Sequence, residues 1–453
     1  MKNSEKYEML SKEGAGVPSN MAILPKGKSI QFDAEKIRES LENSSFFDLL
    51  SFSEAEVAED LLFEQSYDAE IKYRGVIYNV NIYVGDAQEL RIEEYGFANK
   101  IDDEELRQAV EQKCFVETSL YFGEDNISSF HLQLKIMDAI VPDASVVVDF
   151  MSYRLLSAQW LSMAAQSAVP PSPDYLYSLH CVYDEDEAGN RAYWFHTHGL
   201  HRCKTVELEM LNISQGAEQM QTLINMTVRK FLSDPTQEKE RFTIGYDGMG
   251  INLCWLRWEK ALNSFPKTVL GGVNERKEEG DVHTEPSGVL FAVEEKNMIS
   301  PEIYAQTLAN NPIYYITTEE TERMSALAKE RFNLFKKAFE VWGISEGKES
   351  FVKKLFKSKR KYDENEWSFL VKLGLSVDSS ETGEDKEHLW FEVKSIDDKK
   401  MTAKLLNQPY WIAGLKEGDE NDYTLDLLTD WIIYAPNNTY TTDTIYQLNT
   451  SLL

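Results

Sequence analysis

Two stretches of the chain show the residue-by-residue alternation of apolar and polar side chains that is typical of β-hairpins. In residues 71–86, IKYRGVIYNVNIYVGD, the alternation is interrupted at Arg74-Gly75, which predicts a strand, a tight turn and a second strand. Residues 175–184 and 191–200 flank the polar segment EDEAGN in the same way. We therefore expect two antiparallel hairpins, the second of them long.

Other segments repeat their apolar residues every three to four positions, which indicates amphipathic helices. Asp33 precedes one such run and is a suitable N-cap. Ser53 with Glu56 forms a capping-box pattern that predicts another helix start. A longer apolar stripe predicts a single helix over about 318–342, and its side chains are expected to pack in a core.

The order of these elements favours a multi-domain α+β fold, because helices alternate with strands that come partly as hairpins. In chain order we expect a flexible tail (1–20), an α/β-layered N-terminal domain (21–168), a β-hairpin-rich central domain with the long helix (169–350), a basic linker (351–364) and a small C-terminal β-barrel-like domain (365–453). The pattern leaves open whether residues 21–350 form one domain or two.

Composition narrows the classes of partner and compartment. The net charge of −29 repels nucleic-acid phosphates, so nonspecific nucleic-acid binding is not expected, whereas a basic protein partner is easily accommodated. The four cysteines include no Cys-x-x-Cys pair, which indicates reduced thiols. The N-terminus lacks the apolar segment of a secretion signal, and no run of apolar residues is long enough to span a membrane. We therefore expect a cytoplasmic protein.

The stretch WFHTHGLHRC, residues 194–203, holds three of the seven histidines of the chain. On a strand, His196 and His198 point to the same face, because side chains alternate with a period of two. His201 follows after Gly199, where the chain can bend back. His196, His198 and His201 are therefore the candidate metal ligands, and zinc is the ion that such a set would hold.

Residues across the predicted hairpin could complete the same set. A turn within EDEAGN would bring His180 or Cys181 close to residues 194–196, and Glu207 and Glu209 follow soon afterwards in the sequence. Three such ligands with an open fourth position would make a bound zinc ion catalytic.

A purely structural role for the histidines competes with the metal site, and it is the interpretation that we favour from the sequence. The stretch lacks the helix-borne His-Glu-x-x-His pattern and has no second ligand pair at a recognisable spacing. No Gly-x-Ser-x-Gly elbow is present either. We therefore assign no catalytic residue and no cofactor, and keep the three histidines as a metal site to test.

Two parts of the chain resemble known bacterial families. WFHTHGLHRCKTVELEML, with WLRWEKAL downstream, resembles domain-of-unknown-function family 4026. The C-terminal EHLWFEVKSIDDKKMTAKLLNQPYWIAGLKEGD, with LTDWIIY after it, resembles domain-of-unknown-function family 2314, including its Leu406-Asn407-Gln408-Pro409 step, Gly418-Asp419 and Asp430-Trp431. Together the resemblances cover most of the chain from about residue 20. They imply a shared architecture and supply no catalytic residues.

The aromatic residues of the C-terminal part are expected to serve the core. Trp431 is predicted to fill the centre of the barrel, with a partner for its indole N–H. Trp390, Tyr410 and Trp411 are expected to pack inside rather than to line a recognition groove.

Two functions follow as hypotheses of different classes. The favoured one is a bacterial protein without enzymatic activity that binds a protein or acts as a scaffold, of which an immunity-like protein that masks a basic partner is a sharper form. The alternative is a metal-dependent hydrolase that uses the HTHGLH stretch.

Overall fold

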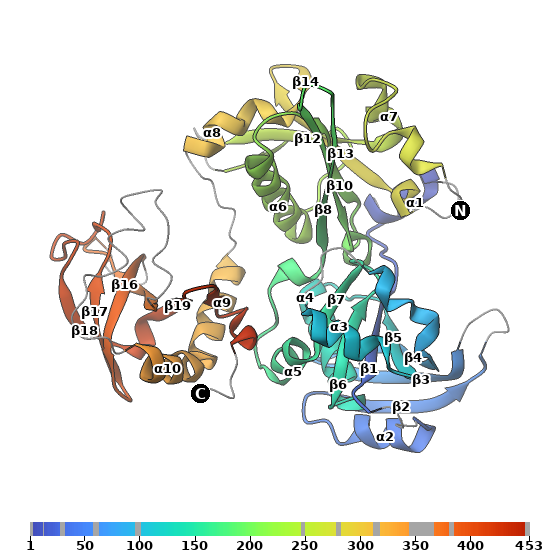
Figure 1. Ribbon diagram of the computed structural model, residues 1–453, viewed down its shortest axis with the longest axis horizontal. Helices are drawn as coiled ribbons and strands as arrows, with labels where there is room; N and C mark the ends of the chain where they lie inside the picture. The colour runs from blue at the N-terminus through green and yellow to red at the C-terminus, as the bar shows by residue number, and fades with distance from the viewer. Residues whose placement is uncertain are drawn as a thin grey trace. The chain divides into compact units, whose positions relative to one another are not determined.

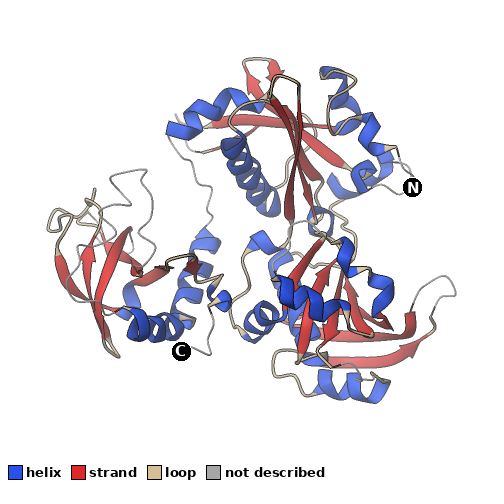
Figure 2. Ribbon diagram, in the orientation of Figure 1, coloured by secondary structure: helices blue, strands red, loops and turns tan. Residues whose placement is uncertain are grey.

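The structure is a computed structural model with a mixed α+β architecture, as the sequence predicts (Figures 1 and 2). It describes residues 3–11, 13–27, 32–57, 63–95, 101–245, 250–277, 282–310, 318–343, 367–379 and 385–448. The chain divides into two compact units, residues 1–166 with 171–315 and residues 167–170 with 316–453. Residues 21–315 therefore belong almost entirely to one unit. The predicted basic linker lies outside the described residues.

The first unit begins with an antiparallel seven-stranded sheet in the order β2-β3-β4-β5-β1-β6-β7. Its strands are β1 (Ser19–Pro25), β2 (Asp48–Ala55), β3 (Phe63–Tyr73), β4 (Val76–Asp86), β5 (Cys114–Leu120), β6 (Ala144–Asp149) and β7 (Arg154–Ser157), and its helices are α2 (Ala34–Glu42), α3 (Asp103–Val110), α4 (Asn126–Ile140) and α5 (Ala158–Gln166). The predicted β3–β4 hairpin is present, and both turn residues, Arg74 and Gly75, have positive φ as a tight turn requires.

Local capping signals predict one helix of this sheet correctly and one wrongly. The Asp33 carboxylate accepts a hydrogen bond from the Lys36 amide at 2.9 Å and caps α2. Ser53, in contrast, lies in β2 and pairs with Asp68 of β3. The segment around Ser53 instead forms strand β2, which pairs with β3 of the hairpin. Strand pairing thus outweighs the local capping-box pattern.

A second seven-stranded sheet completes the first unit, in the order β11-β12-β13-β10-β9-β8 with β14 beside β13. Its strands are β8 (Ser178–Glu185), β9 (Arg191–His198), β10 (Glu207–Ile213), β11 (Phe242–Ile244), β12 (Ile251–Arg257), β13 (Ser287–Glu294) and β14 (Asn297–Ile299). Helices α1 (Asn3–Ser11), α6 (Ala217–Ser233), α7 (Trp258–Ala261) and α8 (Ala305–Asn310) accompany it. Of the described pairs in this sheet, only β10 with β13 is parallel.

The segment expected to be a flexible tail is partly helical and packed. Tyr7 and Leu10 of α1 are buried in the core of the second sheet, together with Met220 and Leu223 of α6. The Tyr7 hydroxyl donates to the Ser287 carbonyl at 2.7 Å. The prediction of a loose tail over 1–20 is therefore wrong for α1, because its apolar residues are too few to show a periodic pattern in the sequence.

A buried ion pair joins the two sheets of the first unit. Arg202 and Asp149 are both fully buried and form two hydrogen bonds of 2.9 Å. The Arg202 guanidinium also donates to the Leu176 carbonyl at 2.7 Å, and Asp149 accepts from the Met151 amide at 3.1 Å. Because both groups have several partners, the pair can be buried without an unsatisfied charge.

The second unit is an open six-stranded antiparallel sheet in the order β18-β17-β16-β15-β19-β20. Its elements are β15 (Ser368–Ser376), β16 (Lys386–Ile396), β17 (Lys400–Leu405), β18 (Glu420–Thr424), β19 (Leu428–Tyr434), β20 (Thr439–Thr441), α9 (Thr318–Glu330) and α10 (Phe332–Trp342). Its described strands do not close into the small barrel that we expected. Trp431 is buried as predicted, and its indole N–H donates to the Ala328 carbonyl at 3.0 Å.

The predicted helix over 318–342 is two helices, and both lie in the second unit rather than in the central part. Arg331 separates them with φ −95° and ψ 3°, and its guanidinium donates to the Thr442 carbonyl at 2.7 Å. The helix therefore breaks at Arg331, although the apolar stripe continues from α9 into α10.

Short 3-10 helices link these elements: η1 (Ala87–Leu90), η2 (Ile92–Glu94), η3 (Pro173–Tyr175), η4 (Leu200–Cys203), η5 (Leu262–Ser264), η6 (Val273–Arg276), η7 (Val282–Thr284), η8 (Pro301–Tyr304), η9 (Leu425–Leu427) and η10 (Ile445–Gln447).

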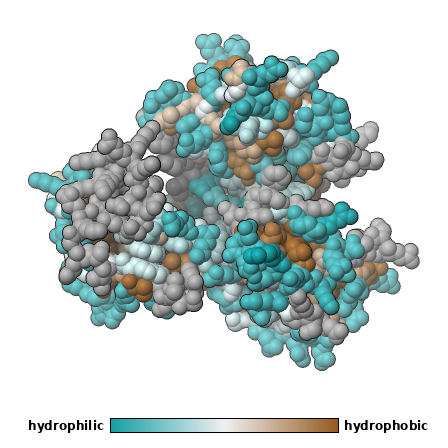
Figure 3. Space-filling view, in the orientation of Figure 1, coloured by the Kyte–Doolittle hydropathy of each residue, from teal (hydrophilic) through white to brown (hydrophobic). Residues whose placement is uncertain are grey.

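On the face drawn in Figure 3 the described side chains are largely hydrophilic, with apolar side chains in separate patches. Within the described part of the chain, no helix has the length and apolar character to cross a membrane.

The Arg202–Asp149 pair generates a stability prediction. Asp149→Ala alone should lower the free energy of unfolding by about 3–5 kcal/mol, because it leaves the Arg202 charge buried without its partner. Urea denaturation followed by tryptophan fluorescence measures this change. The double substitution Arg202→Met with Asp149→Leu should recover part of the loss. A single variant as stable as the parent protein would show that the pair does not hold the sheets together.

Candidate metal centre

The β8–β9 hairpin places two histidines opposite each other. Its polar turn is fixed by Asp186, whose carboxylate accepts from the backbone amides of Ala188 and Asn190 at 2.9 Å each. In the resulting register His180 is paired with His196, and Ser178 with His198. His180 and His196 therefore lie side by side on neighbouring strands, and His198 follows two residues further along the same face.

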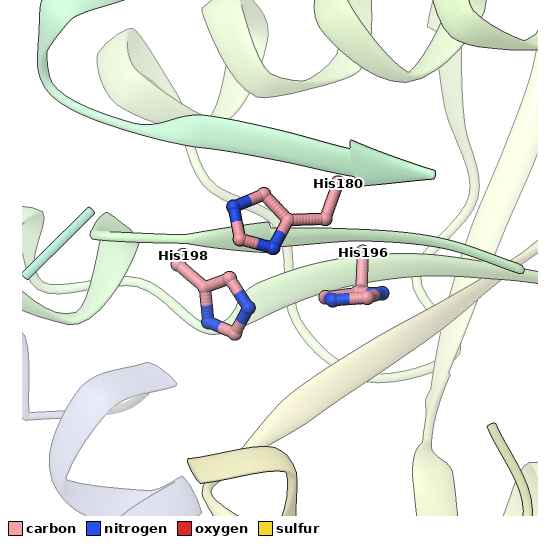
Figure 4. A group of neighbouring side chains, drawn as sticks. All are labelled: His180, His196 and His198. Atoms are coloured by element: carbon pink, nitrogen blue, oxygen red, sulfur yellow. The ribbon is translucent and has the colours of Figure 1, made fainter. Parts of the chain in front are cut away.

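Three imidazoles converge at this point. His180, His196 and His198 each offer one ring nitrogen as a possible metal ligand, and these three nitrogens lie within 4.8 Å of one another. Figure 4 shows the three rings gathered around a common space. Nitrogens bound to a single zinc ion at about 2.0–2.1 Å lie about 3.3 Å apart, so small rotations of the side chains would bring the three into metal–ligand geometry.

A hydrogen bond assigns the tautomer of His180. The Ser178 hydroxyl donates its proton to the Ser152 carbonyl at 2.7 Å and lies 3.2 Å from Nε2 of His180. Because the hydroxyl has only one proton, Nε2 of His180 is the donor in the second contact. The lone pair of the neutral ring is then on Nδ1, which is the nitrogen that could bind a metal ion.

The predicted trio of His196, His198 and His201 is only partly brought together. His201 lies on η4, beyond Gly199, and its Nε2 donates to the Pro286 carbonyl at 2.8 Å. His180 occupies the third position instead. Cys181, its neighbour in the sequence, is solvent-exposed and points to the opposite face of β8.

A fourth histidine was not anticipated from the sequence. His283 lies on η7, and its Nε2 is 3.3 Å from Nε2 of His196. Its ring centroid is 4.8 Å from that of His196 and 5.4 Å from that of His198. An isolated histidine so far along the chain gives no local signal, since only tertiary packing brings η7 onto this face of the sheet.

Two buried carboxylates of β10 organise the surroundings. Glu207 accepts from the backbone amides of Gly199 and Leu200 at 2.9 and 2.8 Å, and from the Thr197 hydroxyl at 2.6 Å. It thereby fixes the turn that follows the histidine strand. With these donors already in place, Glu207 is not a ready metal ligand, although the sequence had suggested it as one.

Glu209 fixes the other end of the histidine row. Its carboxylate accepts from the Trp194 indole at 2.8 Å and from the Arg276 guanidinium at 2.5 Å, and also from the Ser287 hydroxyl. Gly271 packs directly on the Trp194 ring, where an added Cβ would lie 2.6 Å from ring atoms. Trp194 is therefore clamped between the sheet and the η6 region, next to His196.

Burial keeps the three imidazoles neutral. Desolvation lowers the pKa of His196 and of His198 well below the usual range, and the neighbouring imidazoles lower both further. The pKa of His180 is lowered to about 4, mainly by burial and then by His283 and Arg154. A neutral imidazole is the form that binds a transition-metal ion. Nδ1 of His196 is buried and has no hydrogen-bond partner within the described part of the chain.

Comparison with family models divides the chain into three matched parts. Residues 19–171 match "Protein of unknown function (DUF4026) N-terminal", residues 179–291 match "Protein of unknown function (DUF4026) C-terminal", and residues 319–452 match "Uncharacterized protein conserved in bacteria (DUF2314)". Both resemblances seen in the sequence are thus confirmed. The four clustered histidines all lie within the second match. No curated protein and no solved structure matches the chain.

The Glu207 contacts generate a second stability prediction. Glu207→Ala should lower the free energy of unfolding by about 1–3 kcal/mol for each buried amide that loses its acceptor. The matched control is Glu187→Ala in the exposed hairpin turn, which should change stability by no more than about 0.5 kcal/mol. Urea denaturation of both variants makes the comparison. Equal effects would show that Glu207 does not fix the turn after β9.

Proposed function

The chain belongs to the DUF4026 family, with a DUF2314 region after the two DUF4026 matches, and we propose that it binds a first-row transition-metal ion through His180, His196 and His198. Both families are of unknown function, so the proposal rests on the site itself. The observation that carries it is the convergence of three imidazoles, two of them almost fully buried, on one face of the β8–β9 hairpin.

The burial of the cluster favours a cation over an empty space. His196 and His198 are only 4% and 7% exposed, and a buried ring nitrogen without a hydrogen bond costs about 1–3 kcal/mol. A metal ion held between the three rings would be a partner for Nδ1 of His196, which has no hydrogen-bond partner within the described residues. Imidazole ligands suit zinc, copper, iron and nickel, and zinc is the common choice when the ligands are histidines.

The number of ligands indicates the class of chemistry. Three histidines leave a fourth coordination position for water or substrate, which is the arrangement of catalytic rather than structural zinc sites. When bound, the ion would supply Lewis-acid chemistry, and metal-assisted hydrolysis is the activity class that we propose. His283 lies beside His196, and the contact between their Nε2 atoms would help to orient the His196 ring as a ligand.

Metal analysis of untagged protein tests the proposal. We expect about one zinc ion per chain after incubation with Zn²⁺ and removal of excess ion, measured by plasma mass spectrometry. The double variant His196→Ala with His198→Ala should bind none, and His180→Ala should bind at least tenfold more weakly, because each removes a ligand.

Two other histidines provide matched controls for the metal analysis. His201→Ala and His388→Ala should keep the full metal content, because His201 is bonded to Pro286 and His388 lies in the other unit. Metal content well below one ion per chain, unchanged in the double variant, would refute the proposal.

A second candidate function rests on a separate observation in the second unit. Tyr410 and Trp411 are 87% and 67% exposed, so the expectation that they pack in the core is wrong. Their backbone amides donate to the Glu387 carboxylate at 2.8 and 2.9 Å, which fixes the backbone from which the two exposed rings extend. We propose that this pair binds a protein with a basic surface, since arginine side chains stack on such rings and the chain carries a net charge of −29.

Affinity capture at increasing salt tests this second candidate. A specific basic partner should be retained at low salt and released as salt rises, because the attraction is electrostatic. Tyr410→Ala with Trp411→Ala should abolish retention, whereas Tyr183→Ala, an exposed tyrosine in the first unit, should not. Retention that depends on neither salt nor the two rings would contradict this role.

A further inference from the structure

We infer that a cavity beside His198 is the substrate compartment of the metal centre and that it takes a small, uncharged molecule with an apolar body. The inference rests on the proposed metal site and goes beyond it by naming the class of ligand. The cavity has a volume of about 490 Å³, which is within the range of pockets for small organic molecules.

The walls of the cavity come mainly from segments that flank the two sheets of the first unit, and they are mainly apolar. The apolar lining includes Met9, Leu10, Val17, Phe150, Met151 and Val282. They belong to α1, to the segment before β1, to the β6–β7 turn and to η7. Apolar walls favour a ligand that buries carbon surface, at about 25 cal/mol per Å².

The charged groups of the lining have partners already. The Lys6 ammonium and the Glu285 carboxylate form an ion pair of 2.5 Å. The Glu207 carboxylate accepts from backbone amides and from the Thr197 hydroxyl. Among these three groups a charged ligand would find no counter-charge without a partner, whereas an uncharged ligand needs none. The lining therefore selects against net charge.

The cavity reaches the histidine cluster at His198, which is a proposed metal ligand and part of the cavity lining. A molecule in the cavity would therefore lie beside an ion bound by His198. A neutral carbonyl oxygen, as in an ester or an amide, is the group that suits this position, because a Lewis-acid ion polarises it.

Tyr153 forms the part of the wall next to His198. Its ring is edge-on to the His198 ring, with 4.9 Å between centroids. Tyr153 has φ of 51°, a strained value for a residue with a side chain, and the β6–β7 turn is held by hydrogen bonds to the Asp149 carboxylate. Strain of this kind persists where the surroundings fix the backbone, and it is common at ligand sites.

Two hydroxamates that differ only in their apolar part test the inference. Both bind zinc as the same two-oxygen hydroxamate anion, which expands the coordination of the ion to five and whose charge the ion neutralises, so the difference in affinity reports the apolar group. Zinc-loaded protein should bind benzohydroxamate at least tenfold more tightly than acetohydroxamate, because the phenyl ring would be buried in the cavity. Isothermal titration calorimetry measures both affinities.

Variants that fill the cavity complete the test. Val17→Trp and, from a different element, Met9→Trp should remove the preference for benzohydroxamate while the zinc content stays at the parent level. Val76→Trp, on an exposed position of β4, is the matched control and should keep the preference. Two variants are used so that a folding defect in one does not decide the result.

The outcomes separate this inference from the metal proposal. If zinc binds but both hydroxamates bind equally well, or if the filled variants keep the preference, the cavity is not the substrate compartment and the metal site stands. If zinc does not bind, the metal proposal fails and the inference fails with it.

Discussion

Two buried carboxylates on one strand determine where the histidines stand. Glu207 and Glu209 are neighbours on the same face of β10, and β10 lies beside the strand that carries His196 and His198. A carboxylate can be buried only when donors surround it, because the loss of hydration costs several kcal/mol. Glu207 meets this requirement with the backbone of the turn after β9, and Glu209 meets it with Trp194, Arg276 and Ser287. The histidine strand is therefore fixed at both ends.

The register of the β8–β9 hairpin is the second requirement for the site. A shift of a single residue would turn His180 to the opposite face of the sheet, away from His196 and His198. The Asp186 carboxylate prevents this shift, since it bonds the amides of Ala188 and Asn190 within the turn. A short polar turn thus decides whether three imidazoles meet, although none of its residues is near them.

The sequence predicts those features that local patterns determine. Alternation of apolar and polar residues predicts the β3–β4 and β8–β9 hairpins, and it places His196 and His198 on one face of β9. Capping chemistry predicts the Asp33 cap. The same rules fail where a distant contact decides. Ser53 pairs with β3 instead of starting a helix, and the helix predicted over 318–342 breaks at Arg331, whose guanidinium contacts the Thr442 carbonyl. His283 joins the cluster through packing of η7, which no spacing in the sequence encodes.

The contact of α1 with β13 has a consequence for the order of assembly during synthesis. Tyr7 and Ser287 are 280 residues apart in the chain, yet the tyrosine hydroxyl bonds both the carbonyl and the amide of Ser287. Because α1 precedes β13 in the chain, its binding surface is complete only after most of the first unit has been synthesised. Such long-range closure is entropically demanding and slows folding. Helix α1 is accordingly expected to be among the last elements of the first unit to pack.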